Sequence, residues 1–242
     1  MDAVTVQNLS FSYSGGAEVL RDVSFTVSSG EIFVIAGLSG CGKTTLCHIL
    51  SRVIPHSIPG KLSGRALIFG EEPQSLAKAA LHVGLVFQDS DFQLICTAAE
   101  DELGFGLENL CVPPDEIRAR VDDMLDWLGL TEKRLMSPAA LSGGQKKLLA
   151  LGSVLILNPE VVILDEPMTG LDEHSRELVR VAIIKLRERG KTVIIIEHDL
   201  RLVDYADRWL ILHGGSIAAL GTPENMLAAD KALLRGLEMW LD

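Results

Sequence analysis

Residues 32–45, with the sequence IFVIAGLSGCGKTT, decide the fold class of this chain of 242 residues. The stretch begins with a continuous apolar run at 32–36, which is the pattern of a strand buried on both faces of a parallel sheet. Glycines at positions 37, 40 and 42 follow, and glycine permits the positive φ angles that a tight loop needs. We therefore expect a strand, a glycine-rich loop and a helix in immediate succession.

The loop at residues 37–45 matches the phosphate-binding pattern GxxxxGK[ST] in the setting that this pattern requires. Backbone N–H groups of such a loop surround phosphate oxygens, and the helix dipole adds to the attraction. Lys43 is expected to reach the β- and γ-phosphates of ATP, and the hydroxyl of Thr44 to bind Mg²⁺. The loop residues expected to contact ATP are Gly37, Ser39, Gly40, Cys41, Gly42, Lys43, Thr44 and Thr45.

A second buried strand, within residues 161–167 (VVILDEP), ends in two carboxylates. Asp165 is expected to hold Mg²⁺ through water, and Glu166 to act as the general base that aligns the attacking water. Strands often end in an acid, so the pair alone is a weak sign. Beside a phosphate-binding loop it indicates nucleotide hydrolysis.

Residues 141–145, LSGGQ, indicate a second anion site at the start of an apolar helix. Two phosphate-binding ends in separate segments of one chain are explained if two copies meet head to tail. Each copy then completes the nucleotide pocket of the other. The residues expected to contact the ATP of the partner subunit are Ser142, Gly143, Gly144 and Gln145.

Apolar runs alternate with helical patterns along the rest of the chain, which predicts an α/β fold with a parallel-sheet core. Residues 23–28 alternate between apolar and polar, so antiparallel strands are expected before this core. Residues from about 88 to 150 hold no buried-strand run and are read as an inserted helical subdomain. The further expected elements are strands at 161–164 and 193–196, helices at 117–128 and 173–189, and a hairpin at 209–220.

The composition excludes several classes of protein. The net charge of −11 argues against a nucleic-acid partner, because phosphate backbones are bound by Lys and Arg. The chain contains no apolar run near the roughly 18 residues that cross a bilayer, and its first residues do not resemble a signal peptide. Cys41, Cys47, Cys96 and Cys111 form no CxxC pair, which is typical of a reduced cytosolic protein.

The order of these motifs resembles that of the nucleotide-binding ATPase of ABC transporters, over essentially all 242 residues. The motifs are the phosphate-binding loop, Gln88 after a strand, LSGGQ, VVILDE, GLD at 170–172 and EHD at 197–199. The resemblance implies one ABC ATPase domain over residues 1–242, with a RecA-like P-loop NTPase core. One departure is Lys147-Leu148, where the family commonly has an Arg shortly after LSGGQ.

The resemblance also implies roles for single residues. Tyr13 corresponds to the aromatic residue that stacks on adenine, and His198 to the histidine that touches the γ-phosphate. Gln88 corresponds to the glutamine that senses Mg²⁺ and the transmembrane partner, with a part in catalysis and metal binding. Asp172 corresponds to the carboxylate that faces the opposite subunit.

The stretch between residues 83 and 117 holds eight acidic residues and no Lys or Arg. A solvated acidic face is one reading. The sequences FQDSDFQL and EDELGFGLENL are also similar to the ATPases of energy-coupling factor (ECF) transporters, which import vitamins and transition-metal ions. That resemblance implies an acidic groove for Arg-bearing coupling helices of an integral membrane scaffold protein. The residues expected to dock this partner are Asp91, Gln93, Glu100, Asp101 and Glu102.

The resulting hypothesis is an ATP-hydrolysing subunit of an ECF-type importer, at the cytoplasmic face of the cell membrane. A small substrate-binding membrane subunit is a further implied partner, and the ATPases pair as a homodimer or with a paralogous ATPase. Many ECF ATPases carry a further dimerising segment, whereas this chain ends after LLRGLEMWL, so dimerisation is expected to depend on ATP and the scaffold. The alternatives are an ordinary ABC importer ATPase, a non-transport ABC ATPase and a regulatory module that binds ATP without hydrolysis.

Overall fold

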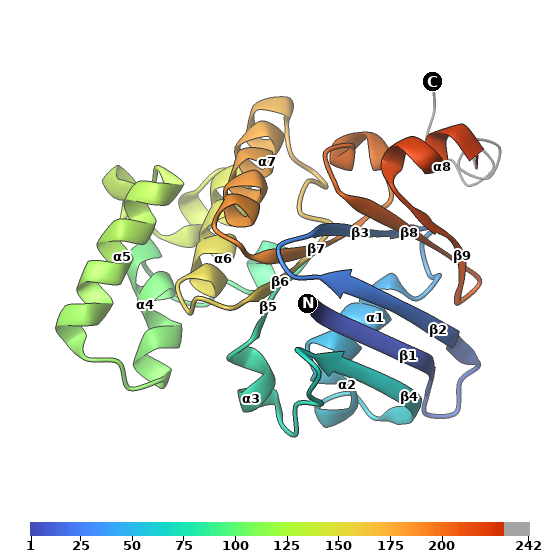
Figure 1. Cartoon of the computed structure of the whole chain (residues 1–242). Coiled ribbons are helices and arrows are strands. Elements are labelled where there is room, and N and C mark those ends of the chain that lie inside the picture. The colour runs from blue at the N-terminus through green and yellow to red at the C-terminus, as the bar shows by residue number, and fades with distance from the viewer. Residues whose placement is uncertain (230–242) are drawn as a thin grey trace. The chain divides into compact units, whose positions relative to one another are not determined.

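The computed structural model describes residues 1–229, which divide into two compact units (Figure 1). Of the described residues, the first unit contains 1–85, 160–166 and 186–229, and the second contains 86–159 and 167–185. The helical subdomain expected at about 88–150 stays a prediction, and the second unit has wider bounds than that span. The apolar segment at 233–241 lies outside the described residues.

A six-stranded sheet belongs to the first unit and has the strand order β5-β6-β7-β3-β8-β9. Strands β6, β7, β3 and β8 run parallel, and β9 pairs antiparallel with β8 as the expected hairpin. Every residue of β3, β6 and β7 is buried, so the three expected apolar strands and the α/β fold class are confirmed. The strands are β3 (Ile32–Gly37), β5 (Val83–Val86), β6 (Val161–Asp165), β7 (Thr192–Glu197), β8 (Arg208–His213) and β9 (Ser216–Gly221).

The register of this sheet gathers the chemically important strand ends at one edge. Asp165 pairs with Ile196 across β6 and β7, and Glu197 pairs with Ala36 across β7 and β3. The carboxyl ends of parallel strands meet at the same edge of a sheet, which is where such folds bind ligands. The helical segments of the first unit are α1 (Lys43–Leu50), α2 (Val53–His56), α3 (Leu76–Ala80), η4 (Leu200–Val203) and α8 (Pro223–Ala229).

A smaller antiparallel sheet of order β2-β1-β4 also belongs to the first unit. It consists of β1 (Asp2–Tyr13), β2 (Glu18–Ser28) and β4 (Gly60–Ile68). The alternation expected in residues 23–28 is confirmed, because Val23, Phe25 and Val27 are buried. The edge strand β4 is not evident from the sequence, since only Ala66 and Ile68 of its residues are buried.

The second unit is largely helical (Figure 1). The helices expected at 117–128 and 173–189 are confirmed, although α5 begins earlier because Pro114 occupies its first turn, where a missing N–H costs little. Helices α4, α5 and α6 pack together at Gly152, where an added Cβ would lie 2.6 Å from Leu128 and 3.0 Å from Leu103. The helical segments are η1 (Ser90–Phe92), α4 (Ala99–Asn109), α5 (Pro114–Leu128), η2 (Thr131–Lys133), η3 (Pro138–Ala140), α6 (Gly143–Leu155) and α7 (Glu173–Glu188).

Candidate functional site

The predicted phosphate-binding loop joins β3 to α1 and depends on glycine at both ends. A Cβ at Gly37 would lie 2.4 Å from the Leu212 carbonyl oxygen and 2.4 Å from Cys41 Sγ. Gly42 has a φ of 111°, and a Cβ there would lie 2.7 Å from a methyl group of Leu20. The backbone contact excludes a side chain at Gly37 unless the backbone moves, and the φ of Gly42 is one that other residues rarely adopt. The loop can therefore hold its conformation only with glycine at these positions.

Lys43, the first residue of α1, points back into this loop. Its side chain is buried, and Nζ donates to the carbonyl oxygens of Gly37 at 2.7 Å and Leu38 at 3.1 Å. This conformation places one positive charge among the backbone groups that are expected to surround phosphate. Cys41 is buried in the same loop, and its burial raises the pKa of the thiol. Cys41 is therefore a neutral packing residue at ordinary pH.

Asp165 and Thr44 supply the oxygen atoms that a magnesium ion would need. Asp165, at the end of β6, is buried, and burial raises the pKa of its carboxyl while a hydrogen bond from Thr44 lowers it. A buried carboxylate beside a hydroxyl is a donor set that suits Mg²⁺, and the charge of the ion would offset the cost of burying the carboxylate. The residues present therefore fit the expected ion.

Glu166 has a backbone conformation that the sequence does not predict. Its φ is +45°, in the left-handed region, which costs a non-glycine residue about 1–2 kcal/mol. Its N–H donates to the Ile196 carbonyl oxygen at 3.0 Å, so β7 helps to hold this turn. Strained residues of this kind cluster at functional sites. Glu166 Oε1 lies 3.9 Å from His198 Nδ1.

His198 follows the last residue of β7, Glu197, and the sequence reasoning missed the part that Glu197 plays. Glu197 is fully buried, and its Oε1 lies 3.0 Å from His198 Nδ1. The available signal was a lone carboxylate at the end of the apolar run at 193–196. The first unit thus brings together Lys43, Asp165, Glu166 and His198 at the ends of adjacent strands and of the loop.

Tyr13, at the end of β1, belongs to the same unit. Its hydroxyl lies 2.9 Å from Thr45 Oγ1, and its ring packs edge-on against Phe11 with 5.0 Å between the ring centroids. Tyr13 as a whole is 38% exposed, so part of the residue remains accessible to a ligand. This contact links the residue expected at adenine to the helix that follows the phosphate-binding loop.

The LSGGQ segment lies in the second unit and begins α6. Ser142 and Gln145 form a reciprocal capping box, in which each side chain accepts from the backbone N–H of the other residue. Gly144 packs so closely against α7 that a Cβ would lie 2.3 Å from Ser175 Oγ. Asp172 in turn accepts from the Ser175 N–H at 2.7 Å, and this bond lowers the pKa of its carboxyl.

The acids of the acidic stretch also lie in the second unit, and basic side chains from elsewhere in the chain reach two of them. Lys146 Nζ lies 2.7 Å from Asp91 Oδ1, and an Arg134 N–H donates to Glu100 at 2.9 Å. Both bases come from distant parts of the sequence, which a local count of charges cannot include. Lys147, at the departure from the family pattern, is buried and donates to the Gln88 carbonyl oxygen.

The remaining expected docking residues differ in exposure. Gln93 accepts from the Phe87 N–H at 3.0 Å and donates to the Ala150 carbonyl oxygen at 3.2 Å. Glu102 is buried and accepts from the N–H groups of Ile95 and Cys96, each at 2.8 Å. Asp101 is exposed. Glu102 therefore stabilises the loop before α4, and Asp91 and Asp101 are the acids better placed to meet a partner.

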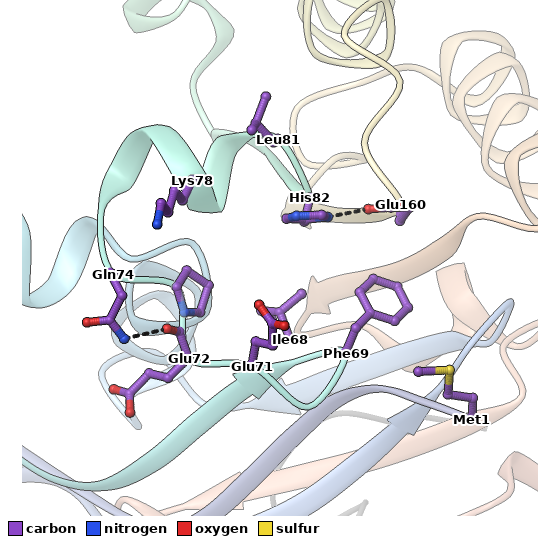
Figure 2. A pocket seen from close by; sticks show the side chains of 11 residues that line it. Met1, Ile68, Phe69, Glu71, Glu72, Gln74, Lys78, Leu81, His82 and Glu160 are labelled. Atoms are coloured by element: carbon purple, nitrogen blue, oxygen red, sulfur yellow. Dashed lines mark hydrogen bonds and ion pairs between the residues drawn. The ribbon is translucent and has the colours of Figure 1, made fainter.

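A separate pocket of about 570 Å³ in the first unit contains no residue of the predicted site (Figure 2). The side chains of His82 and Glu160 point toward one another there, with 2.6 Å between Nδ1 and Oε2. The N–H groups of Glu160 and Val161 also donate to the His82 carbonyl oxygen. These contacts join the segment before β5 to the start of β6, which is a structural role.

Comparison with known proteins assigns the family. The model of the family described as "ABC transporter" matches residues 20–169. The chain belongs to the ABC transporter family. It is an ABC transporter ATP-binding subunit and an ATPase. Over the described residues, this ABC ATPase contains no helix long and apolar enough to cross a membrane.

Three relatives show the extent of the similarity. An ABC transporter ATP-binding protein of Pyrococcus abyssi is 40% identical, over 93% of this chain and 82% of that protein. The energy-coupling factor transporter ATP-binding protein EcfA of Methanosarcina acetivorans is 38% identical, over 93% of this chain and 81% of that protein. A relative from Streptomyces avermitilis is 40% identical, and this chain spans 41% of its length.

A solved structure resembles the fold over nearly the whole chain. It is that of cbiO1 from Clostridium perfringens, described as part of the ABC transporter complex cbiONQ. The TM-score is 0.86 at 31% sequence identity, covering 99% of this chain and 96% of the other. The P-loop ABC ATPase fold is therefore confirmed.

Proposed function

We propose that this ABC ATPase is the ATP-hydrolysing subunit of an ECF-type importer for a vitamin or a transition-metal ion. It is a peripheral subunit at the cytoplasmic face of the cell membrane. The observation that carries the proposal is the convergence of Lys43, Asp165, Glu166 and His198 within one unit. The similarity to EcfA and to cbiO1 supports the ECF branch.

Different residues of the chain bind the phosphates, hold the metal ion and activate the attacking water. Backbone N–H groups of residues 37–45 and the ammonium of Lys43 bind the phosphates of ATP. Thr44 and Asp165, with Gln88 as a further ligand, would hold Mg²⁺, which when bound neutralises phosphate charge. The carboxylate of Glu166 orients and polarises the attacking water, and the imidazole of His198 contacts the γ-phosphate.

Two ATPase chains act together in this proposal. Residues 142–145 of one chain contact the ATP that is bound to the loop of the other, and Asp172 faces the opposite subunit. The capping box at Ser142 supports this role, because it fixes the first turn of α6, whose N–H groups suit an anion. The partner is a second copy of this chain or a paralogous ATPase.

The membrane partner is a scaffold protein with Arg-bearing coupling helices, together with a small substrate-binding membrane subunit. Asp91 and Asp101 offer carboxylates to the arginines, with Gln93 and Glu100 beside them. Asp91 forms a salt bridge with Lys146, and the Asp91 side chain is 66% exposed. Exposed salt bridges stabilise a protein by only about 0–1 kcal/mol. An incoming guanidinium with bidentate geometry can therefore displace Lys146 at small cost.

An ordinary ABC importer ATPase is the second candidate. It is favoured by the Pyrococcus relative, which is described only as an ABC transporter ATP-binding protein. Purification from native membranes separates the two candidates. A small substrate-binding membrane protein with a scaffold is expected for the ECF type, and a pair of large permeases would contradict it.

The hydrolytic role is tested with Glu166→Gln. We expect ATP binding to persist and turnover to fall about 10²- to 10⁴-fold, the usual contribution of a positioned base. Glu160→Gln is the matched control, since Glu160 precedes the same strand and is exposed. Unchanged phosphate release by Glu166→Gln would remove Glu166 from its proposed role.

The docking role is tested with Asp91→Lys. We expect this variant to lose most of its co-purification with the membrane scaffold while it retains ATP binding. Asp115→Lys is the control, because Asp115 is an exposed acid in the first turn of α5 in the same unit. Undiminished co-purification of Asp91→Lys would exclude Asp91 from the docking surface.

A further inference from the structure

Glu197 is a carboxylate in a position where a carboxylate is costly. It is the last residue of β7 and is fully buried. Its Oε1 accepts from the N–H groups of His198 at 2.8 Å and Asp199 at 3.3 Å. Within residues 1–229, no hydrogen-bond partner reaches its Oε2. Buried polar groups normally have partners, so a half-satisfied carboxylate needs a reason to be present.

The imidazole of His198 supplies that reason. His198 Nδ1 lies 3.0 Å from Glu197 Oε1 and 3.9 Å from Glu166 Oε1. Of the two carboxylates, that of Glu197 is the nearer to Nδ1. The Nδ1 edge of the ring therefore faces the buried carboxylate, and Nε2 lies on the opposite edge of a side chain that is 56% exposed.

We propose that Glu197 is a positioning residue for ATP hydrolysis: its carboxylate accepts a hydrogen bond from Nδ1–H of His198, so that Nε2 is directed to the γ-phosphate. This inference rests on the proposed function, in which His198 contacts the γ-phosphate. In this proposal Glu197 acts through His198 and not on ATP directly.

The chemistry follows from the two ring nitrogens. A hydrogen bond from Nδ1–H to a carboxylate fixes both the orientation and the tautomer of an imidazole. When Nε2 takes a proton from solvent, the ring becomes an imidazolium. The new Nε2–H can then donate a hydrogen bond to a phosphate oxygen. The buried carboxylate stabilises that charge at close range.

The electrostatics of Glu197 agree with a paired role. Burial raises the pKa of its carboxyl, and the backbone N–H groups of His198 and Asp199, with the imidazole of His198, lower it. The neighbouring carboxylate of Glu166 raises it again. The imidazole of His198 therefore favours the charged form of Glu197. Loss of either side chain should change the behaviour of the other.

A double-mutant cycle tests the inference through ATP turnover. Glu197→Gln is expected to lower kcat about 10- to 100-fold, the usual cost of removing a carboxylate that orients a functional histidine, with a smaller change in KM. The double variant Glu197→Gln/His198→Ala should match His198→Ala within about twofold, because coupled residues are not additive. A further loss in the double variant, or wild-type turnover by Glu197→Gln, would overturn the inference.

Controls separate this inference from folding and from the proposed function. Glu31→Gln removes another buried carboxylate of the first unit and is expected to leave turnover unchanged. Wild-type turnover by His198→Ala would overturn the proposed role of His198 itself. Wild-type turnover by Glu197→Gln beside an impaired His198→Ala would overturn only the role of Glu197.

A measurement on the wild-type protein does not depend on ATP turnover. Histidine labelled with ¹⁵N, assigned by comparison with His198→Ala, reports the tautomer of each neutral ring. We expect His198 to carry its proton on Nδ1 at alkaline pH. A proton on Nε2 with a bare Nδ1 would overturn the inference without reference to ATP hydrolysis.

Discussion

Gly144 provides a prediction whose magnitude comes directly from the packing of α6 against α7. A Cβ at Gly144 would lie 2.3 Å from Ser175 Oγ and 2.5 Å from Ser175 Cβ. Rotation of the serine cannot relieve the second contact, so the helices must move apart. At Gly143, one residue earlier, an added Cβ would meet only a methyl group of Leu171 at 3.7 Å, an ordinary contact.

The difference in stability between Gly144→Ala and Gly143→Ala isolates the free-energy cost of the close contact with Ser175. Both substitutions gain about the same helix propensity, about 1 kcal/mol, which therefore cancels in the difference. Overpacking a well-packed site costs about 1–3 kcal/mol. Since 1 kcal/mol shifts Tm by about 2–4 °C for a chain of this size, Gly144→Ala should unfold about 2–12 °C below Gly143→Ala.

Thermal unfolding of the two purified variants, followed by circular dichroism without nucleotide, measures this difference. Ser175→Gly should relieve the contact, so Gly144→Ala should cost less stability in that background than in the wild type. Midpoints of Gly144→Ala and Gly143→Ala that agree within one degree would refute the packing argument.

Two further predictions concern Cys96 and Tyr13. Burial, followed by the charge and hydrogen bond of Glu102, raises the pKa of the Cys96 thiol to about 11. At pH 8.5, mass spectrometry should therefore show slow alkylation of Cys96 and fast alkylation of the exposed Cys111. Glu102→Gln should accelerate the alkylation of Cys96. Equal alkylation rates at Cys96 and Cys111 in the wild-type protein would contradict this. Tyr13→Ala should weaken ATP binding about 5- to 150-fold, since stacking of a base on an aromatic ring contributes about 1–3 kcal/mol, while Tyr13→Phe should bind within a few-fold of wild type. Calorimetric titration checks this, and tight binding by Tyr13→Ala would exclude the stacking role.

Much of the fold and of the ATP site is predictable because its chemistry is local. The loop at 37–45 and the pair Asp165-Glu166 are contiguous, and each follows a buried strand. The buried strands of a parallel sheet read as continuous apolar runs, so β3, β6 and β7 are evident from the sequence. The capping box at Ser142 is likewise contained within four residues.

Other features depend on contacts between distant residues. The acidic stretch acquires Lys146 and Arg134 from 55 and 34 residues away, which no local charge count includes. Strand β4 depends on its pairing with β1 more than on an apolar pattern of its own. The role of Glu197 requires the register of β7, and the left-handed turn at Glu166 requires the bond to Ile196. Each of these features depends on contacts between residues that are far apart in the sequence. Secondary-structure propensity and hydrophobic periodicity, which are local, do not predict such contacts.

The central claim is that residues 37–45 of one ATPase chain and 141–145 of its partner hold the same triphosphate. Cysteines placed at Ser39 and Ser142, both exposed in the structure, test it directly in the Glu166→Gln background, where bound ATP persists. With Mg²⁺ and ATP, we expect an oxidant to link the two chains through these cysteines, and neither variant that carries only one of the two substitutions to do so. A protein that binds ATP yet stays monomeric and unlinked would contradict the claim.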